Sequence, residues 1–392
     1  MSAISVEEEE KRWKQICSSV WRHEQPVFVL YILKKKVSWP DADSQERFIR
    51  EVYQQHRKYP FSATYARSLL KALVQDVERS GNVIEDSLME NFLETLDTNG
   101  GDTAVENFNA SEGEEDVCHF SYILDATVVP LRIFRKGNLV GLRAWEAGLF
   151  LTSFCLQYIP HSFQERRVVE LGAGIGCTGI LLAKGLHSSS YTRGRGSYPS
   201  KKGLKSLVMT DFNDEVNDNL RHNVKAAAIS QCMAESKPEL DCTDNKVTVA
   251  HLDWRTVQTA DDVASLGAAD IVLAADCTYS EDICEHVLRT IEMILRAGSA
   301  RSAETATEGE GELENESETD AVYWEQVTSV GPVALLACTK RSEETFLHLQ
   351  GLLGKSELKI RDLSGWGRAA AKGSLLLAED SENSVYLYSI TL

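Results

Sequence analysis

The spacing of hydrophobic and polar positions changes part-way along the chain. Up to about residue 95, apolar residues recur at helical spacing, as in SQERFIREVYQQHRKY and in SATYARSLLKALVQDVE, where Ser62 stands as the predicted helix cap. Trp13, Trp21 and Trp39 lie in this region. They could form a stacking surface for bases, but aromatic residues at helical spacing are usually core. The pattern therefore predicts a helical N-terminal domain over residues 1–95.

The next two segments predict a linker and a hairpin. Residues 96–116, LDTNGGDTAVENFNASEGEED, are polar and acidic and predict a linker or disordered loop. The following run, HFSYILDATVVPLRIFRKGNLVG, predicts an antiparallel hairpin that turns at Gly137 and Asn138. We expect a second domain over residues 117–392.

From residue 166 onward, strand-like and helix-like runs alternate. Such alternation predicts an α/β fold with a doubly wound, mostly parallel, seven-stranded Rossmann-like sheet. Residues 364–384 contain no convincing helical pattern, so the closing strand is expected to be antiparallel. Two inserts, a basic one at about 188–204 and an acidic one at about 298–320, are expected to be flexible. The predicted strands are 166–171, 206–212, 247–252, 270–275, 330–339, 358–363 and 385–390.

Composition and charge narrow the classes of partner. The net charge of −18 comes from two acidic segments, 81–116 and 302–320, that together carry −19 and leave the rest of the chain at +1. Because the rest of the chain is nearly neutral, its charge does not favour binding to nucleic acid or to an anionic membrane. No apolar run is long enough for a membrane span, and the first residues are acidic, unlike a signal peptide. Nine scattered cysteines indicate reduced thiols inside the cell, without a zinc motif.

A glycine-rich turn follows the first strand of the alternating region. In VVELGAGIGCTG, residues 168–179, Gly172, Gly174 and Gly176 allow a tight turn that approaches a ligand closely, which indicates a nucleotide-like cofactor. Asp211, at the end of the next strand, is suited to bind ribose hydroxyls. Gly174, Gly176 and Gly179 also satisfy the dinucleotide fingerprint. A dehydrogenase, however, needs a further domain for its substrate, and no sequence is left to form one.

The fourth strand ends in DIVLAADCTYS and presents Asp276 and Tyr279. A buried strand needs neither residue for packing, so they are candidates for catalysis or substrate binding. Asp276 as a helix cap is less favoured, because Ser280 is better placed. A metal site built from Asp276, Cys277, Cys284 and His286 has a spacing that suits no zinc pattern. Cys277 as a nucleophile lacks an adjacent base in the sequence, although spatial neighbours are not visible there.

Four motifs resemble a known family. ELGAGIG with Glu170, together with Asp211, resembles the class I, seven-β-strand methyltransferases that use S-adenosylmethionine. GLRAWEAG, HLDW and ADCTYS resemble methyltransferase family 16, whose members are largely protein-lysine methyltransferases with an Asp-x-x-Tyr motif in the last of these places. The N-terminal domain with KYPFSATYARSLLKAL is similar to the domain that precedes the catalytic part in elongation factor 2 lysine methyltransferases.

The resemblance assigns roles residue by residue. It implies a cofactor site in which the glycine turn passes beside the methionine part, Asp211 holds the ribose, Trp254 lies against the adenine and Asp253 lies near the adenine amino group. Asp276 and Tyr279 would face the substrate lysine. The implied cofactor residues are Trp145, Glu170, Gly172, Ala173, Gly174, Gly176, Asp211, Asp253, Trp254 and Ala275.

The chemistry limits what Asp276 can do. Ordinary lysine and aspartate side chains differ by about 6.5 pKa units, or roughly 9 kcal/mol against direct proton transfer. We therefore expect Asp276 to position the amine and Tyr279 to line a lysine channel. The expected protein is a cytoplasmic lysine methyltransferase that uses S-adenosylmethionine and acts on translation elongation factor 2. A methyltransferase for another protein or a small molecule, a non-catalytic adaptor and an NAD-dependent oxidoreductase stay as alternatives.

Overall fold

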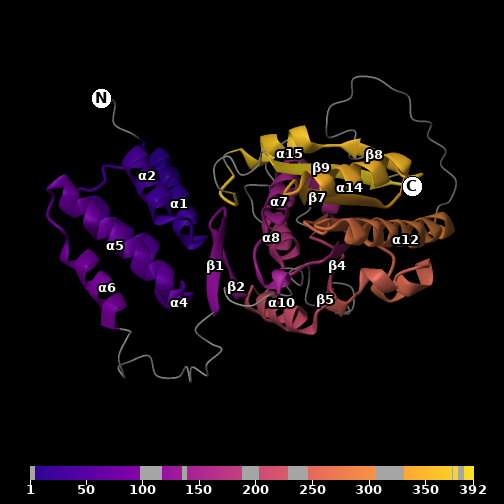
Figure 1. The fold of residues 1–392 in the computed structure, drawn as a ribbon, viewed down its shortest axis with the longest axis horizontal. Coiled ribbons are helices and arrows are strands. Elements are labelled where there is room, and N and C mark those ends of the chain that lie inside the picture. The colour runs from indigo at the N-terminus through magenta and orange to yellow at the C-terminus, as the bar shows by residue number, and fades with distance from the viewer. Residues whose placement is uncertain are drawn as a thin grey trace. The chain divides into compact units, whose positions relative to one another are not determined.

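A computed structural model describes residues 5–97, 117–134, 139–187, 203–227, 246–305, 331–372, 374–377 and 384–392. The chain divides into two compact units, Met1–Asn138 and Leu139–Leu392 (Figure 1). Each unit has its own core.

The first unit begins with helices, as predicted. The Ser62 hydroxyl accepts the Tyr65 N–H at 3.2 Å and caps the longest of them, and Gly81 ends that helix with φ 74°. Trp13, Trp21 and Trp39 are at most 7% exposed, which confirms that they are core residues. The elements are α1 (Val6–Trp21), α2 (Pro26–Lys36), α3 (Ala42–Arg47), the π-helix η1 (Phe48–Tyr53), α4 (Gln55–Lys58), α5 (Ala63–Ser80) and α6 (Asp86–Asp97).

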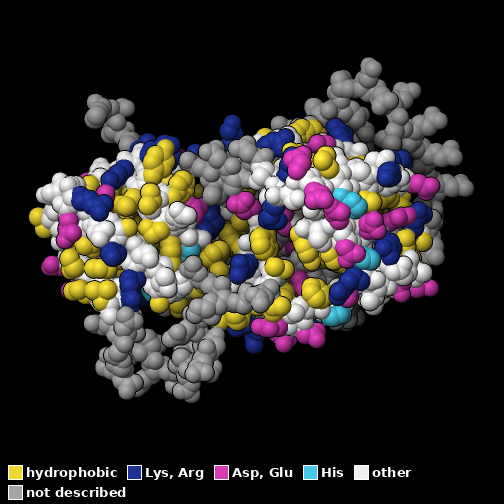
Figure 2. Space-filling model, in the orientation of Figure 1, with side chains coloured by type: hydrophobic (Ala, Val, Ile, Leu, Met, Phe, Trp, Pro, Cys, Tyr) yellow, Lys and Arg dark blue, Asp and Glu magenta, His cyan; other side chains and the backbone are white. Residues whose placement is uncertain are grey.

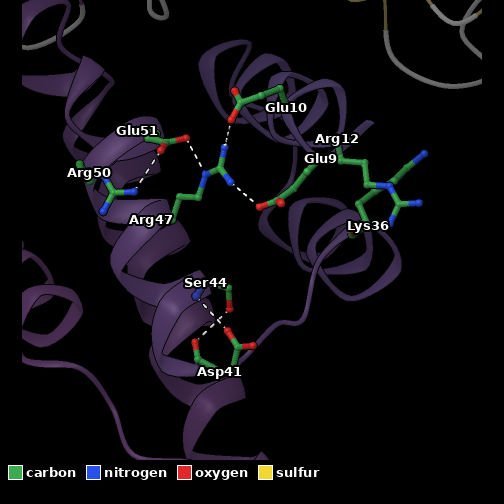
Figure 3. A network of polar contacts seen from close by, with 9 residues as sticks. All are labelled: Glu9, Glu10, Arg12, Lys36, Asp41, Ser44, Arg47, Arg50 and Glu51. Atoms are coloured by element: carbon green, nitrogen blue, oxygen red, sulfur yellow. Dashed lines mark hydrogen bonds and ion pairs between the residues drawn. The ribbon is translucent and has the colours of Figure 1, made fainter. Parts of the chain in front are cut away.

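One arginine links α1 to the junction of α3 and η1 (Figure 3). Arg47 pairs with Glu9 and Glu10 of α1, each at 2.5 Å, and with Glu51 of η1 at 2.8 Å. Its guanidinium also lies 4.8 Å from the ring centre of Trp13. Because the Arg47 side chain is only 16% exposed, this network is better shielded from solvent than an ordinary surface ion pair.

A hairpin completes the first unit. β1 (Val117–Leu124) and β2 (Thr127–Phe134) pair in antiparallel register, which confirms the hairpin. The predicted turn was wrong: the chain reverses at Asp125 and Ala126, where Asp125 takes φ 58°. Gly137 and Asn138 lie outside the described residues. The His119 N–H donates to the Pro60 carbonyl at 2.9 Å, which joins β1 to the helical region. The hairpin therefore belongs to the first unit, whereas the sequence pattern groups residues 117–138 with the second domain.

The second unit is a seven-stranded sheet in the order β5-β4-β3-β6-β7-β9-β8. The first five strands of that order are parallel, and β9 runs antiparallel to both of its neighbours, as expected. All seven predicted strands are present. They are β3 (Arg167–Leu171), β4 (Ser206–Asp211), β5 (Lys246–His251), β6 (Ile271–Ala275), β7 (Val333–Thr339), β8 (Lys359–Asp362) and β9 (Val385–Thr391).

Helices cover both faces of this sheet. Val272 and Ala274 of β6 share a core with apolar residues of α12 and α14, while Ala275 points toward Gly148 of α7 on the other face. The 3-10 segments are η3 (Val140–Leu142), η4 (Pro160–Phe163), η5 (Trp254–Thr256) and η6 (Ala260–Leu266). The helices are α7 (Glu146–Tyr158), α8 (Cys177–Leu186), α10 (Asp214–Ala226), α12 (Glu281–Thr305), α14 (Glu343–Lys355) and α15 (Ser364–Ala371).

Two predictions about loops were wrong. Residues 364–371, expected to lack a helix, form α15. This helix packs so closely on α7 that a Cβ atom at Gly367 would lie 2.2 Å from Phe150. Only glycine fits at this position, although glycine weakens the helical pattern in the sequence. Residues 298–305, counted with the acidic insert, continue α12. The rest of that insert lies outside the described residues.

On the face seen in Figure 2, acidic and basic side chains are interspersed among the described residues of the second unit. This distribution fits the near-neutral body calculated from the sequence. Among the described residues, no helix is both long and apolar enough to cross a membrane.

Candidate active site

The candidate residues of the second unit gather where its parallel strands end. β3 and β6 are neighbours, and the chain leads from β3 to β4 on one side but from β6 to β7 on the other, so the connections from β3 and β6 run in opposite directions. A crevice opens at such a reversal, outside the carboxyl ends of the strands, and it is the usual ligand position in open α/β sheets. The glycine turn and Asp276 directly follow β3 and β6, and Asp211 is the last residue of β4.

The glycine turn has the backbone that its residues predict. Gly172, Gly174 and Gly176 have φ values of 60°, 55° and 89°, a region that favours glycine. A Cβ atom at Gly172 would lie 3.0 Å from both the Trp254 ring and Cys277 Sγ, and one at Gly174 would lie 2.9 Å from the Gly141 carbonyl oxygen. The Ala173 N–H donates a hydrogen bond to the Thr210 carbonyl at 2.8 Å, which fixes the backbone at Ala173. The turn is therefore both tight and closely surrounded.

Glu170 supports this turn from behind. Its side chain is buried, and its Oε2 accepts the Gly179 N–H in the first turn of α8 at 3.0 Å. Burial raises the pKa of Glu170 to about 8, against the lowering effect of its hydrogen bonds with Thr178 and Gly179. Gly179 lies inside α8 against Glu170, and the turn itself is formed by Gly172, Gly174 and Gly176, which have positive φ values.

Asp211 ends β4 beside the turn. Its Oδ2 accepts the Gly174 N–H at 3.3 Å and its Oδ1 accepts the Asn213 N–H at 3.2 Å. Burial raises the pKa of Asp211, although these hydrogen bonds oppose the rise. The carboxylate is thereby oriented against the glycine turn, where the sequence predicted the ribose acceptor.

Trp254 and Asp253 approach the turn from the end of β5. The Trp254 Nε1 atom is buried and has no hydrogen-bond partner among the described residues, so a donor is available close to Gly172. Asp253 holds Arg255, with Nη2 to Oδ2 at 2.7 Å. The hydrogen bond from Arg255 lowers the pKa of Asp253 and keeps it anionic.

Trp145 and Ala275 lie on the α7 side of the edge. Trp145 precedes α7, and its Nε1 donates to the Val140 carbonyl at 2.9 Å. A Cβ atom at Gly148 would lie 3.9 Å from that of Ala275, which places the end of β6 against the first turn of α7. Both residues are partly exposed, as residues bordering a ligand require.

Asp276 takes a left-handed backbone with φ 54°, which aspartate tolerates better than most residues. Its Oδ1 accepts the Thr339 N–H at 2.9 Å, and its Oδ2 accepts the Thr339 hydroxyl at 3.1 Å. Arg341 adds two contacts, Nη2 to Oδ2 at 2.9 Å and Nη1 to Oδ1 at 3.3 Å. The carboxylate therefore bonds to the end of β7 and the loop after it, and not to the first turn of α12 as a helix cap would.

Tyr279 lies near the carboxylates of Asp211 and Asp253, and its side chain is 51% exposed. Burial of the rest of the side chain raises the pKa of Tyr279, and the charges of Asp211 and Asp253 raise it further. Tyr279 also lines a small pocket of about 50 Å³ together with Arg341, Thr278 and Phe346. Asp276 does not line this pocket, but Arg341 on the pocket wall binds Asp276.

Two alternatives for Cys277 and its neighbours lose support. The Cys277 thiol donates to the Leu171 carbonyl at 3.1 Å, and burial raises its pKa well above the ordinary value, so it stays neutral and is a poor nucleophile. Within the described ranges, no group of three or more histidine, cysteine, aspartate or glutamate side chains is placed to bind a metal.

Three residues of this edge were not identified from the sequence. Thr339 and Arg341 end β7 and begin the following loop, and they meet Asp276 only because β6 and β7 are neighbours. Phe212, directly after Asp211, is 48% exposed and lies under the Arg255 guanidinium at 5.7 Å. The signal for all three was available in principle, since each stands at the carboxyl end of a predicted parallel strand.

The residues of this edge fit S-adenosylmethionine. The closely surrounded glycine turn admits a ligand near its backbone, the Asp211 carboxylate suits ribose hydroxyls, and the Trp254 N–H offers a hydrogen bond that no described residue accepts. Trp254, Phe212 and Asp253 provide aromatic surface and an acceptor for a purine with an exocyclic amino group.

Comparisons with known proteins agree with the geometry. The family model described as Lysine methyltransferase, family 16, matches residues 129–301. The protein-lysine N-methyltransferase EEF2KMT of Mus musculus is 27% identical over 323 residues, which cover 77% of this chain and 84% of the relative. The Homo sapiens protein of the same name is 28% identical over 255 residues, covering 64% of this chain and 66% of the relative.

Among solved structures, the 16S rRNA N2 G1207 methyltransferase (RsmC) of T. thermophilus in complex with AdoMet and guanosine is 13% identical. The match covers 83% of this chain and 69% of that one, with a TM-score of 0.38, and it is too slight to bear on activity. The sequence relatives and the fitted site carry the assignment instead. The chain is similar to methyltransferase family 16 over residues 129–301, and it is a methyltransferase that uses S-adenosylmethionine.

Proposed function

We propose that this enzyme methylates a lysine side chain of a protein, and that the protein is translation elongation factor 2, in the cytoplasm. The observation that carries the proposal is the position of Asp276. It is an ion-paired side chain that directly follows Ala275, at the same edge as Asp211 and the glycine turn. A substrate cation is the natural ligand of such a carboxylate.

The relatives support the choice of acceptor. The mouse and human proteins are named for elongation factor 2 and for lysine. The mouse protein aligns with this chain over 323 residues, more than the 254 residues of the second unit, so the similarity extends into the first unit. The first unit is also where the sequence resembles the domain that precedes the catalytic part in these enzymes. We therefore propose that it contributes to recognition of the substrate protein.

The residues of the site act by positioning. S-adenosylmethionine, when bound, supplies a methyl carbon that a neutral amine attacks directly as the bond to sulfur breaks. Alignment of the two reactants and exclusion of water are then the main tasks of the protein. Asp276 accepts a hydrogen bond from the amine and directs its lone pair, while the proton of the incoming ammonium leaves to water. Direct transfer of that proton to a carboxylate is disfavoured by the large gap in ordinary pKa values.

Tyr279 lines the route of the lysine. It is half exposed, and its raised pKa keeps the phenol neutral at physiological pH. A neutral ring face attracts a methylated ammonium, so Tyr279 would retain a lysine between successive methyl transfers.

The test measures which lysines become methylated in a proteome that lacks this protein. Cells lacking this protein are lysed, and the lysate is incubated with the purified enzyme and isotopically labelled S-adenosylmethionine. Mass spectrometry is expected to find label on a lysine of elongation factor 2. Label on the lysines of another protein would correct the substrate, and label on small molecules alone would overturn the proposal of a protein acceptor.

A further inference from the structure

Arg341 holds the position that a substrate cation would need beside Asp276. Each Asp276 oxygen accepts one bond from Thr339 and one from Arg341, at distances between 2.9 and 3.3 Å. A carboxylate offers about four acceptor positions, so all of them are occupied. An incoming amine can bond to Asp276 only if one of these partners leaves.

The two partners differ in how readily they can leave. Thr339 binds through its backbone N–H and hydroxyl at the end of β7, directly across from the end of β6. Arg341 lies in the loop before α14, and its side chain is 44% exposed while that of Asp276 is 4% exposed. Arg341 therefore lies between Asp276 and solvent.

The surroundings of the guanidinium form a site for cations in general. Arg341 lies 4.8 Å from the ring centre of Trp145 and is paired with the Asp276 carboxylate. A carboxylate together with an aromatic face also binds ammonium and methylammonium groups. A lysine that takes this place would preserve the pairing of Asp276, and so avoid the cost of leaving a buried charge alone.

The small pocket supplies the adjoining space. Arg341 and Tyr279 both line it, together with Thr278 and Cys338. When Arg341 moves aside, the pocket and the released space join at the Tyr279 ring. This is where the methylenes of a lysine side chain would lie.

We propose that Arg341 is a positioning residue that occupies the cation site of Asp276 and Trp145 until the lysine ammonium of the acceptor displaces it. The exchange rests on the proposed lysine acceptor. It explains how a carboxylate with no vacant acceptor position receives a substrate. It also keeps Asp276 paired and correctly turned while no acceptor is bound.

A binding experiment tests the cation site without any turnover. Thermal unfolding of wild type, Arg341→Gln and the matched control Arg296→Gln is followed in n-butylammonium chloride and in sodium chloride of equal concentration. Arg296 is exposed and pairs only with Glu292 of its own helix among the described residues. Butylammonium should raise the Tm of Arg341→Gln alone, and the added change Asp276→Asn should abolish the rise. An Arg341→Gln protein that responds equally to both salts would overturn the proposal.

Kinetics with elongation factor 2 separate exchange from simple bracing. Removing the competing cation should lower KM for the acceptor by about tenfold, because a ligand loses affinity in proportion to the fraction of sites closed to it. Arg341→Lys should give an intermediate KM. A fall in kcat at unchanged KM would show that Arg341 only braces Asp276, against the proposal. If wild type transfers no methyl group to this protein, the proposed substrate is wrong, and the butylammonium result decides the role of Arg341.

Discussion

Arg341 covers both oxygens of Asp276, with its closer nitrogen at 2.9 Å, although the two residues are 65 positions apart in the chain. Thr339 holds the same carboxylate from β7. A carboxylate that is held by four contacts of this kind is fixed in direction, as a positioning group requires. A general acid or base, in contrast, needs a proton that it can exchange.

Replacement of Asp276 should separate transfer from cofactor binding. Asp276→Asn keeps the shape of the side chain but removes the charge that holds the substrate cation, so we expect kcat to fall by about a hundredfold or more. Calorimetry should find the S-adenosylmethionine Kd within about twofold of wild type. Asp282→Asn, at an 80% exposed position of α12, is the control and should change neither value. Loss of cofactor affinity in step with activity would show that Asp276 belongs to the cofactor site.

The glycine turn should not accept a side chain. Gly174→Ala places a Cβ atom 2.9 Å from the Gly141 carbonyl oxygen at a backbone with φ 55°. We expect a loss of roughly 1–3 kcal/mol in the free energy of unfolding, measured with urea. Gly351→Ala is the matched control, because Gly351 lies within α14 with no atom within 4 Å of the added carbon. It should stabilise the protein by about 0.5–1 kcal/mol, and equal effects at both sites would contradict the described turn.

The buried carboxyl of Glu170 should make stability depend on pH. The pKa of Glu170 is raised from 4.5 to about 8 in the folded protein. Its contribution to the free energy of unfolding is therefore fully present below pH 4.5 and is lost as the pH rises through 8. Glu170→Gln keeps an acceptor for Gly179 and does not ionise. We expect the stability of this variant relative to wild type to increase from pH 5 to pH 8 by roughly 3 kcal/mol, and then to level off. A difference that does not change with pH would mean that Glu170 is not buried as a neutral acid.

The Trp254 indole should contribute a hydrogen bond to the cofactor. Trp254→Phe retains an aromatic face but removes the buried N–H that has no partner among the described residues. We expect calorimetry to show an affinity for S-adenosylmethionine roughly 3- to 10-fold weaker, the effect of one lost hydrogen bond. An unchanged affinity would place the cofactor away from this donor.

The sequence predicted those parts of the structure that depend on local patterns. The seven strands appear because buried parallel strands are continuous apolar runs, and Ser62 caps α5 because its hydroxyl serves a neighbouring N–H. The hairpin turn was misplaced because Gly137 and Asn138 give a stronger turn signal than Asp125, whose left-handed backbone depends on the register of β1 and β2. Helix α15 was missed because Gly367 weakens the helical pattern. The glycine is needed there because the Phe150 ring, far away in the sequence, leaves no space for a side chain.

The site shows the same division. Asp211 and the glycine turn are recognisable from their own motifs, and the structure brings them together. Glu170 lies in the glycine motif as well, yet its role in supporting α8 depends on burial that the motif does not reveal. The bonds of Thr339 and Arg341 to Asp276 follow from the order of strands in the sheet, which a single sequence does not specify.

The most direct test of the central claim is transfer to one purified acceptor. Elongation factor 2 from cells that lack this protein is incubated with the wild-type enzyme and labelled S-adenosylmethionine, and its peptides are examined by mass spectrometry. The account predicts one or more methyl groups on a lysine side chain, and none when the enzyme carries Asp276→Asn. A wild-type enzyme that binds S-adenosylmethionine but labels no lysine of elongation factor 2 would contradict the proposed function.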